Sequence, residues 1–304
     1  MAKDFDYYFA QLRRIEDHRE QNAEKEIRKL YKQLLKETKE FVSEEYYKLA
    51  QDGKLTFEIL RSKGRDVRFL EEVEQKLKSV PHKISKEIRN TADTLYKMAY
   101  DGMIDAVNNS NTPDELKANL RGLKGISAET ANAAVKNPIM DIALEKNHKD
   151  VLWDIKREIA VGLTMGDRYE TMARRISEKL DRNYKTSILI ARTEAGRVRE
   201  AGHLASAKNI NDKLVQGESG VQMTKTWKTM RDGAVRDHHR SMNGKVAQMD
   251  EAFELPDGIL TQAPKQSGAA KHDCNCRCFV KYVLMDDEQF YSATGKHFKE
   301  TLQK

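Results

Sequence analysis

The sequence predicts an α+β protein with predominantly α-helical N-terminal and middle regions and a small mixed α/β module at the C-terminal end. Only five prolines interrupt the 304 residues, so long stretches are free of helix breakers. Charged residues make up 34% of the chain, which favours many exposed helical faces. After residue 220, turn residues and period-two alternation replace the helical pattern. We therefore expect three regions, which are residues 1–110, 111–210 and 211–304.

The N-terminal region, residues 1–110, begins with apolar residues at three- and four-residue steps, the spacing of one face of a helix. The first of them are Phe5, Tyr8, Phe9, Leu12 and Ile15. Opposite charges in "EKEIRKLYKQLLKETKE" add ion pairs one helical turn apart. We expect a long exposed helix or a helical hairpin that serves as a docking arm for a partner.

The middle region, residues 111–210, opens with Thr112-Pro113-Asp114-Glu115, a pattern typical of a capped helix start. Helical runs follow at 150–162 and 169–180, and between them Gly166 is expected to make a turn and Asp167 a cap.

Small residues then form a stripe at helical spacing, which lets another element approach closely. They are Ala191, Ala195, Val198, Gly202 and Ala205. The same segment is basic at its edge, with Arg192, Arg197 and Arg199, and 151–250 holds nineteen basic residues against thirteen acidic ones. Such a run is either a solvated helix face or a surface for nucleic acid or an acidic partner.

The C-terminal module, residues 211–304, reads as two strands with a short helix and a long loop between them. Alternation predicts strands over 224–230 and 276–285, and 234–242 predicts a short helix that Asn243-Gly244 ends. Pro256 and Pro264 mark the loop. A module of this size needs a staple beyond its apolar core.

All three cysteines, Cys274, Cys276 and Cys278, lie within five positions. Their number is odd, and thiols two residues apart on an extended chain sit about 7 Å apart, beyond easy disulfide geometry. We therefore expect reduced thiols. No apolar run has the length of a signal peptide or a membrane span, so we expect a cytosolic protein that meets no membrane.

Three roles for these cysteines remain open on spacing alone. His239 and two of the three thiolates supply the nitrogen and sulfur ligands that Zn²⁺ prefers, provided that the C-x-C backbone bends. Alternatively, the thiols are buried and pack against Trp227 and Phe279, or they take part in redox chemistry.

The triplet Asp237-His238-His239 invites a catalytic interpretation, with a histidine as general base and the aspartate orienting it. However, neighbouring residues on a helix point about 100° apart, so only one of the histidines can face a given site. In the alternative interpretation, Arg236 and His239 hydrogen-bond carbonyls of the loop between Pro256 and Pro264.

The order of several short motifs resembles that of the Mu F-type phage minor head proteins, also called phage head morphogenesis proteins. The resemblance covers roughly residues 150–282. It rests on "ARTEAGR" at 191–197, Trp227, Arg231-Asp232, Val235-Arg236, His239, Asn243-Gly244, Phe253, a proline-bearing loop, and Asn275-Cys276-Arg277-Cys278.

This resemblance implies a minor capsid protein of a tailed bacteriophage, assembled in the host cytoplasm and lying inside the capsid at the portal vertex. It implies the portal protein, capsid or scaffold proteins and double-stranded DNA as partners, and no settled enzymatic activity. The alternative is a metal-dependent hydrolase or nuclease that uses Asp237, His238 and His239.

Within this framework we expect three groups of site residues. Arg192, Arg197 and Arg199 would contact DNA phosphates without sequence preference. Trp227, Arg236 and Gly244 would be structural anchors of the module. Zn²⁺, if bound, would take its ligands from His239, Cys274, Cys276 and Cys278, although Cys274 departs from the family pattern.

Overall fold

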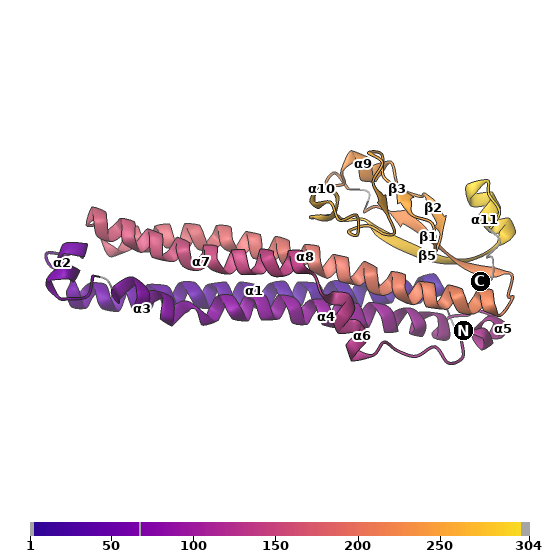
Figure 1. The fold of residues 1–304 in the computed structure, drawn as a ribbon, viewed down its shortest axis with the longest axis horizontal. Coiled ribbons are helices and arrows are strands. Elements are labelled where there is room, and N and C mark those ends of the chain that lie inside the picture. The colour runs from indigo at the N-terminus through magenta and orange to yellow at the C-terminus, as the bar shows by residue number, and fades with distance from the viewer. Residues whose placement is uncertain (1–2, 67, 231, 299–304) are drawn as a thin grey trace. The chain divides into compact units, whose positions relative to one another are not determined.

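The computed structural model describes residues 3–66, 68–230 and 232–298, and Figure 1 shows its elements in chain order. It confirms the predicted α+β class, with long helices followed by a small antiparallel sheet. Arg231, which belongs to the motif order above, lies outside the described residues. Among the described helices, none combines the length and the apolar character that a membrane span requires.

The helices before the sheet are longer than the sequence periodicity alone defines. They are α1 (Phe5–Leu49), α2 (Phe57–Ser62), α3 (Arg68–Leu77), α4 (Ser79–Asn109), α5 (Asp114–Asn119), α6 (Ala128–Val135), α7 (Pro138–Met165) and α8 (Tyr169–Gln216). Residues 5–49 thus form one helix, not a hairpin. α7 ends at Gly166, whose φ of 64° is the predicted left-handed turn.

The C-terminal part contains short elements around two longer strands. They are β1 (Val221–Lys228), α9 (Asp237–Arg240), β2 (Val246–Gln248), β3 (Phe253–Glu254), β4 (Leu260–Thr261), α10 (Ala270–Asp273), β5 (Phe279–Asp286) and α11 (Asp287–Thr294). β1, α9 and β5 match the two strands and the short helix expected there. The strands β2, β3 and β4 lie in stretches that the sequence predicts as loops.

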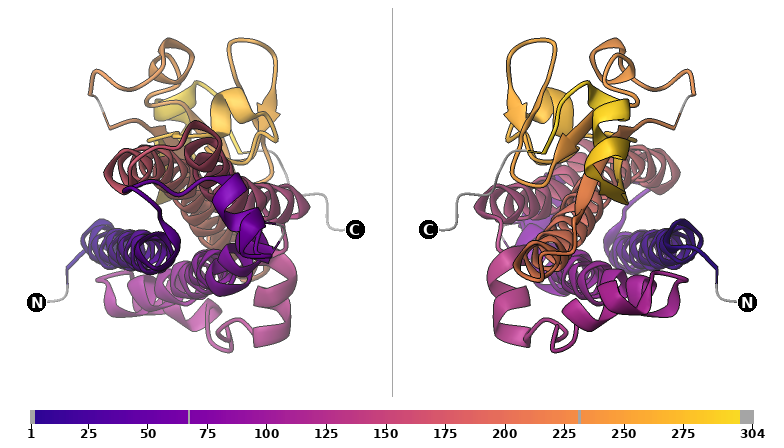
Figure 2. Two further views of the ribbon diagram at one scale, coloured as in Figure 1. Left: turned by 90° about the vertical axis from the view of Figure 1, so that its left-hand side faces the viewer. Right: turned by 90° about the vertical axis from the view of Figure 1, so that its right-hand side faces the viewer.

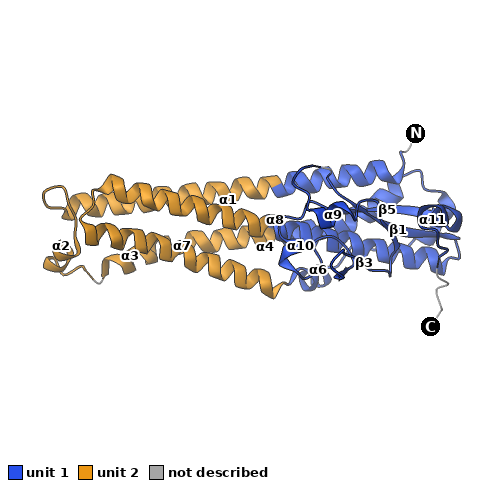
Figure 3. Cartoon of the chain, turned by 90° about the horizontal axis from the view of Figure 1, so that it is seen from above, with its two compact units in different colours: residues 1–20, 91–136, 192–304 blue, residues 21–90, 137–191 orange. Residues whose placement is uncertain are grey.

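The chain divides into two compact units, coloured separately in Figure 3. Unit 1 contains residues 1–20, 91–136 and 192–304, and unit 2 contains residues 21–90 and 137–191. Each of the long helices α1, α4 and α8 therefore contributes residues to both units. The three-part division by sequence stays a prediction.

Unit 2 is helical, and its core is made of aliphatic and aromatic side chains from α1, α3, α4, α7 and α8. One polar cluster lies inside this core. The Tyr31 hydroxyl lies 2.9 Å from Ser187 Oγ, and Asn147 Nδ2 donates to the same oxygen at 2.8 Å. These bonds satisfy groups that burial would otherwise penalise.

Unit 1 holds the three-stranded sheet, in which β1 lies between β2 and β5 and pairs antiparallel with both. Apolar residues of α8, among them Leu204, Ile210 and Leu214, share one core with Trp227, Val280 and Tyr282 of the sheet. The end-on views of Figure 2 show the strands gathered on one side of α8.

The small-residue stripe of α8 makes close helix packing possible, as the sequence predicts. Ala195, Val198 and Gly202 are buried, whereas Ala205 is partly exposed. A Cβ at Gly202 would lie 2.6 Å from the Tyr96 carbonyl oxygen of α4, so only glycine fits at this contact.

A buried ionic cluster links α1, α8 and β5 within unit 1. The fully buried Glu200 accepts from Arg13 at 3.1 Å and from the backbone N–H of Val280 at 3.0 Å. Arg199, also buried, pairs with Asp17 of α1 at 2.7 Å. Because the Glu200 carboxylate is shielded from water, it depends on these protein partners for its hydrogen bonds. The cluster therefore holds β5 on α1 and α8.

Candidate metal centre

The candidate site lies in unit 1, where α9, α10 and the segment before β5 meet. α9 carries His239, α10 carries His272, and Cys276 and Cys278 precede β5 on irregular backbone. Asn275, with φ of 54°, bends the chain before them. This bend lies between Cys274 and Cys276 and interrupts the extended chain that would carry all three cysteines in one line.

His239, Cys276 and Cys278 form a buried group whose ligand atoms all lie within 4.8 Å of one another. His239 Nδ1 lies 3.4 Å from Cys276 Sγ and 3.5 Å from Cys278 Sγ. With Zn–S of about 2.3 Å and Zn–N of about 2.0 Å, a tetrahedral zinc site has an N···S edge of about 3.5 Å. Both nitrogen–sulfur distances thus already match those between zinc ligands.

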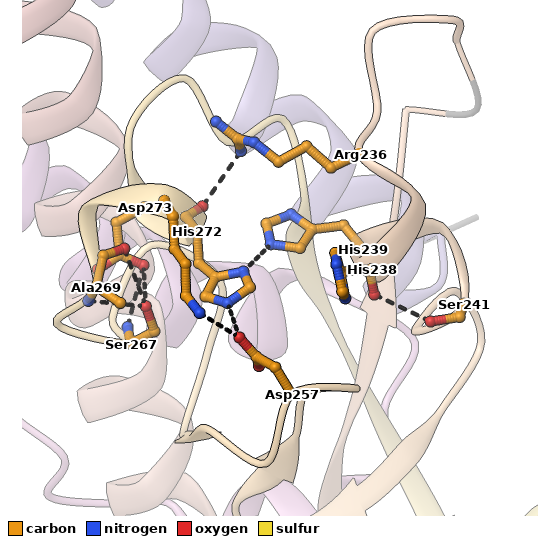
Figure 4. Close-up of polar contacts among 10 residues, drawn as sticks. Arg236, His238, His239, Ser241, Asp257, Ser267, Ala269, His272 and Asp273 are labelled. Carbon is orange, nitrogen blue, oxygen red and sulfur yellow. Dashed lines mark hydrogen bonds and ion pairs between the residues drawn. The ribbon is translucent and has the colours of Figure 1, made fainter.

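Behind His239 runs a chain of hydrogen bonds, drawn in Figure 4. His239 Nε2 lies 3.2 Å from His272 Nδ1, and His272 Nε2 lies 2.8 Å from Asp257 Oδ2. The carboxylate assigns the proton of His272 to Nε2, which makes His272 Nδ1 the acceptor and His239 Nε2–H the donor. His239 Nδ1 then carries a lone pair facing the sulfurs, as a metal ligand requires.

The carboxylate at the end of this chain is held ionised. Lys271 lies 2.7 Å from Asp257, and its hydrogen bond, followed by that of His272, lowers the pKa of Asp257 well below its usual range. Asp257 therefore remains an acceptor for His272 at neutral pH.

A hydrogen bond between the two thiols moves their pKa values in opposite directions. The hydrogen bond from Cys278 lowers the pKa of Cys276 below its ordinary value, although burial acts against this shift and His239 supports it. The same hydrogen bond, together with burial, raises the pKa of Cys278. Cys276 is thus the sulfur that more readily carries negative charge.

Cys274, the remaining predicted ligand, is not part of this group of three. It is partly exposed and follows α10 directly, and its carbonyl oxygen accepts a hydrogen bond from Arg236. Its contact with the site is therefore made through the backbone.

The predicted anchors Trp227, Arg236 and Gly244 all lie around the site. Trp227 packs edge-on against His239, with ring centroids 5.8 Å apart, and its indole N–H interacts with Cys278. Arg236 donates to the carbonyls of His272 and Cys274, not to those between Pro256 and Pro264. Gly244 adopts φ of 92° and donates to the Trp227 carbonyl at 2.8 Å.

The structure does not assemble the catalytic triplet proposed from Asp237, His238 and His239. The Asp237 side chain is 91% exposed and pairs with Arg240, whereas His239 is 2% exposed. The carboxylate nearest to His239 in the hydrogen-bond chain is instead Asp257, reached through His272.

Of the three arginines expected to contact DNA, only Arg192 is exposed. Arg197 forms a two-pronged ion pair with Glu194 and donates to the Val135 carbonyl. Arg199 is buried against Asp17 and Glu20. No observation on the described residues tests the DNA contact itself, which stays a prediction.

Sequence reasoning missed His272 and Asp257. His272 lies in the same "KHDCNCRC" stretch as the cysteines, so its position four residues before Cys276 was a usable signal. Asp257 carries no such signal, because only the fold brings the loop after β3 against α10.

Comparison with known proteins identifies relatives along most of the chain. The model of the family described as Phage Mu protein F like protein matches residues 153–281. The minor head protein GP7 of Bacillus phage SPP1 is 30% identical over 267 residues, which cover 86% of this chain and 82% of that protein.

A second relative is similar over a shorter segment. The NAD(+)–arginine ADP-ribosyltransferase EFV of Enterococcus faecalis (strain ATCC 700802 / V583) is 31% identical over 153 residues, 50% of this chain and 30% of that protein. No solved structure matches the chain significantly.

Proposed function

The chain belongs to the Mu F-like family of minor head proteins of tailed phages, and from this premise we propose that it is built into the virion head at the portal vertex. The observation that carries this proposal is the similarity to GP7, which runs through the helices as well as the C-terminal module. The similarity to EFV covers too little of that protein to bring its activity to this chain. The proposed role is structural, with capsid or scaffold proteins as further partners.

We propose that the portal protein docks on α7 in unit 2. Ile139, Ile142 and Trp153 are 73%, 67% and 59% exposed. At 100° per residue these three positions fall within about 60° of the helix circumference, so they share one face. Large exposed apolar side chains on one face are typical of protein interfaces, and tryptophan is often their energetic centre.

The double variant Ile142→Asp/Trp153→Ala is expected to reduce the amount of cognate portal protein that co-purifies at least tenfold. The reason is the loss of apolar contact area together with a charge that the interface would have to bury. The measurement is co-expression with the portal followed by affinity capture and quantification.

Lys36→Ala is the matched control, since Lys36 is 74% exposed on α1 of the same unit. It should leave the portal yield unchanged. Equal portal yields for the double variant and the wild type would contradict the proposal that the portal protein docks on α7.

We also propose that the metal centre holds one Zn²⁺ through His239, Cys276 and Cys278. Support comes from the two nitrogen–sulfur distances, which match the edge of a tetrahedral site, and from the hydrogen-bond chain that fixes the His239 tautomer. Two thiolates would neutralise the ion inside a buried site. Bound there, the ion would join α9 to the segment before β5, which is the staple that a module of this size needs.

We propose finally that the protein contacts double-stranded DNA without sequence preference. Support comes from the excess of basic residues in 151–250 and from the similarity to a minor head protein, a component of a DNA-filled particle. Contacts of this kind are made to phosphates, and they weaken steeply as the salt concentration rises.

A further inference from the structure

A pocket of about 770 Å³ opens in unit 1 beside the metal centre, between α1, α8 and the loops before α9 and β5. Pockets that hold small molecules commonly measure about 300–1,000 Å³. Its charged lining is mostly cationic, with two acidic side chains, Asp17 and Glu20, against six basic ones. The basic ones are Arg13, Arg192, Arg199, Arg236, Lys265 and Arg277.

Lys265 is the unusual member of this lining. Its side chain is 8% exposed, yet no hydrogen-bond acceptor or ion-pair partner meets its ammonium group among the described residues. The aliphatic stem lies over Gly196 of α8, where a Cβ would come within 2.7 Å of Lys265 Cε. The glycine of the "ARTEAGR" motif therefore makes room for a buried cation.

The carboxylates around the pocket form their ion pairs with other cations. Arg199 pairs with Asp17 and Glu20, Arg13 with the buried Glu200, and Arg277 with Asp232. Among the side chains that line the pocket, six are basic and two are acidic. A buried charge without a counter-ion is strongly unfavourable, so the protein gains stability when an anion enters.

The titration behaviour of Lys265 agrees with this geometry. Burial lowers its pKa, and the neighbouring Arg199 lowers it further. Glu200, Cys276 and Glu20 act in the opposite direction without cancelling the shift. A bound anion would favour the charged ammonium form and so raise this pKa.

We propose that this pocket binds a phosphate group, with the Lys265 ammonium as its central ligand and Arg277 at its edge. Phosphate matches the pocket in charge, because a monoester carries up to two negative charges near neutral pH. It also matches in geometry, because guanidinium groups bind its oxygens in pairs. The group can belong to a free phosphate compound or to the backbone of a nucleic acid, and the second source rests on the proposed DNA contact.

The first test uses inorganic phosphate as the probe, at constant ionic strength, with thermal unfolding and isothermal titration as readouts. Wild-type protein should unfold at temperatures that rise with phosphate concentration and should bind one phosphate per chain. Lys265→Met, which keeps the stem and removes the charge, should lose at least tenfold in phosphate affinity. Without phosphate it should be as stable as the wild type or more so.

Two further variants make the result specific. Arg277→Gln alters a side chain that is 48% exposed, so it should fold normally and still bind phosphate several-fold more weakly. Lys245→Met alters an exposed lysine outside the pocket and should change nothing. Unchanged phosphate affinity in Lys265→Met, or lower stability of that variant without phosphate, would overturn the proposal.

The second test separates the two sources with a short DNA duplex at several salt concentrations. If the duplex binds the wild type and loses affinity in Lys265→Met, the pocket takes a backbone phosphate. If duplex binding is equal in both proteins while phosphate binding differs, the pocket takes a free phosphate compound. A wild type that binds phosphate but no DNA contradicts the DNA contact and leaves the pocket standing.

Discussion

Replacing Cys276 and Cys278 by serine is expected to abolish the proposed zinc binding and to destabilise the C-terminal module far more than Cys274→Ser does. Serine keeps the size of the side chain and removes the thiolate, so the metal loses two of three protein ligands. A metal present at about 1,000 times its dissociation constant stabilises the folded state by about 4 kcal/mol. Elemental analysis and thermal unfolding of protein purified under reducing conditions provide the measurement.

Cys274→Ser is the matched control, because Cys274 lies in the same stretch but outside the ligand group. It should retain about one zinc per chain and nearly all of the stability. A chelator should reproduce the loss in wild-type protein, and added zinc should reverse it. Less than about a tenth of an equivalent of zinc in the wild type, or an equal loss in Cys274→Ser, would refute the three-ligand site.

Glu200→Gln is expected to lower the free energy of unfolding by about 3–5 kcal/mol, the usual cost of removing one member of a buried ion pair. The substitution keeps the shape of the side chain and an oxygen that can accept from Val280. It removes the charge that compensates Arg13 and, at 4.0 Å, Arg199. Chemical denaturation monitored by circular dichroism measures the loss.

The same carboxylate predicts a dependence on pH. Burial opposes ionisation of Glu200, but Arg13, His203 and Arg199 outweigh it, so the pKa of Glu200 is lowered. Its stabilising charge is therefore present above the unfolded pKa of about 4.3 and is lost as the pH falls through the lower folded value. Glu200→Gln should lose less stability than the wild type as the pH falls below about 4.3.

The exposed Glu254, also in unit 1, gives the control for the loss of a glutamate charge. Glu254→Gln should stay within about 0.5 kcal/mol of the wild type, as surface substitutions usually do. A Glu200→Gln protein as stable as Glu254→Gln would show that the cluster does not hold the sheet on the helices.

The helices could be predicted because their signals are local and repeated. Apolar spacing predicted α1, and Gly166 predicted the end of α7, where only a left-handed residue continues the chain. The small-residue stripe likewise predicted the close approach that Gly202 makes to Tyr96. The lengths of the helices exceeded the prediction because tertiary packing, rather than propensity, stabilises most of a long helix.

The short strands could not be predicted in the same way. β3 and β4 have two residues each, too few for alternation to appear, and they exist through their pairing with one another. Asp257 and Lys265 were missed for a related reason. Their importance comes from the groups that surround them in space. Asp257 lies against His272, and Lys265 lies against Gly196.

The spacing of the cysteines in the sequence was not enough to identify the metal ligands. Three cysteines in five positions point to a ligand cluster, but the sequence does not define which sulfurs converge. Asn275 decides this, because its left-handed backbone bends the chain between Cys274 and Cys276.

The most direct test of the role in the phage head is to produce the protein together with its cognate capsid, scaffold and portal proteins and to purify the resulting procapsids. Quantitative mass spectrometry should find the protein in these particles at a few copies each, and its amount should fall to background when the portal gene is left out. Particles that lack the protein, or that hold the same amount with and without portal, would contradict its assignment to the portal vertex.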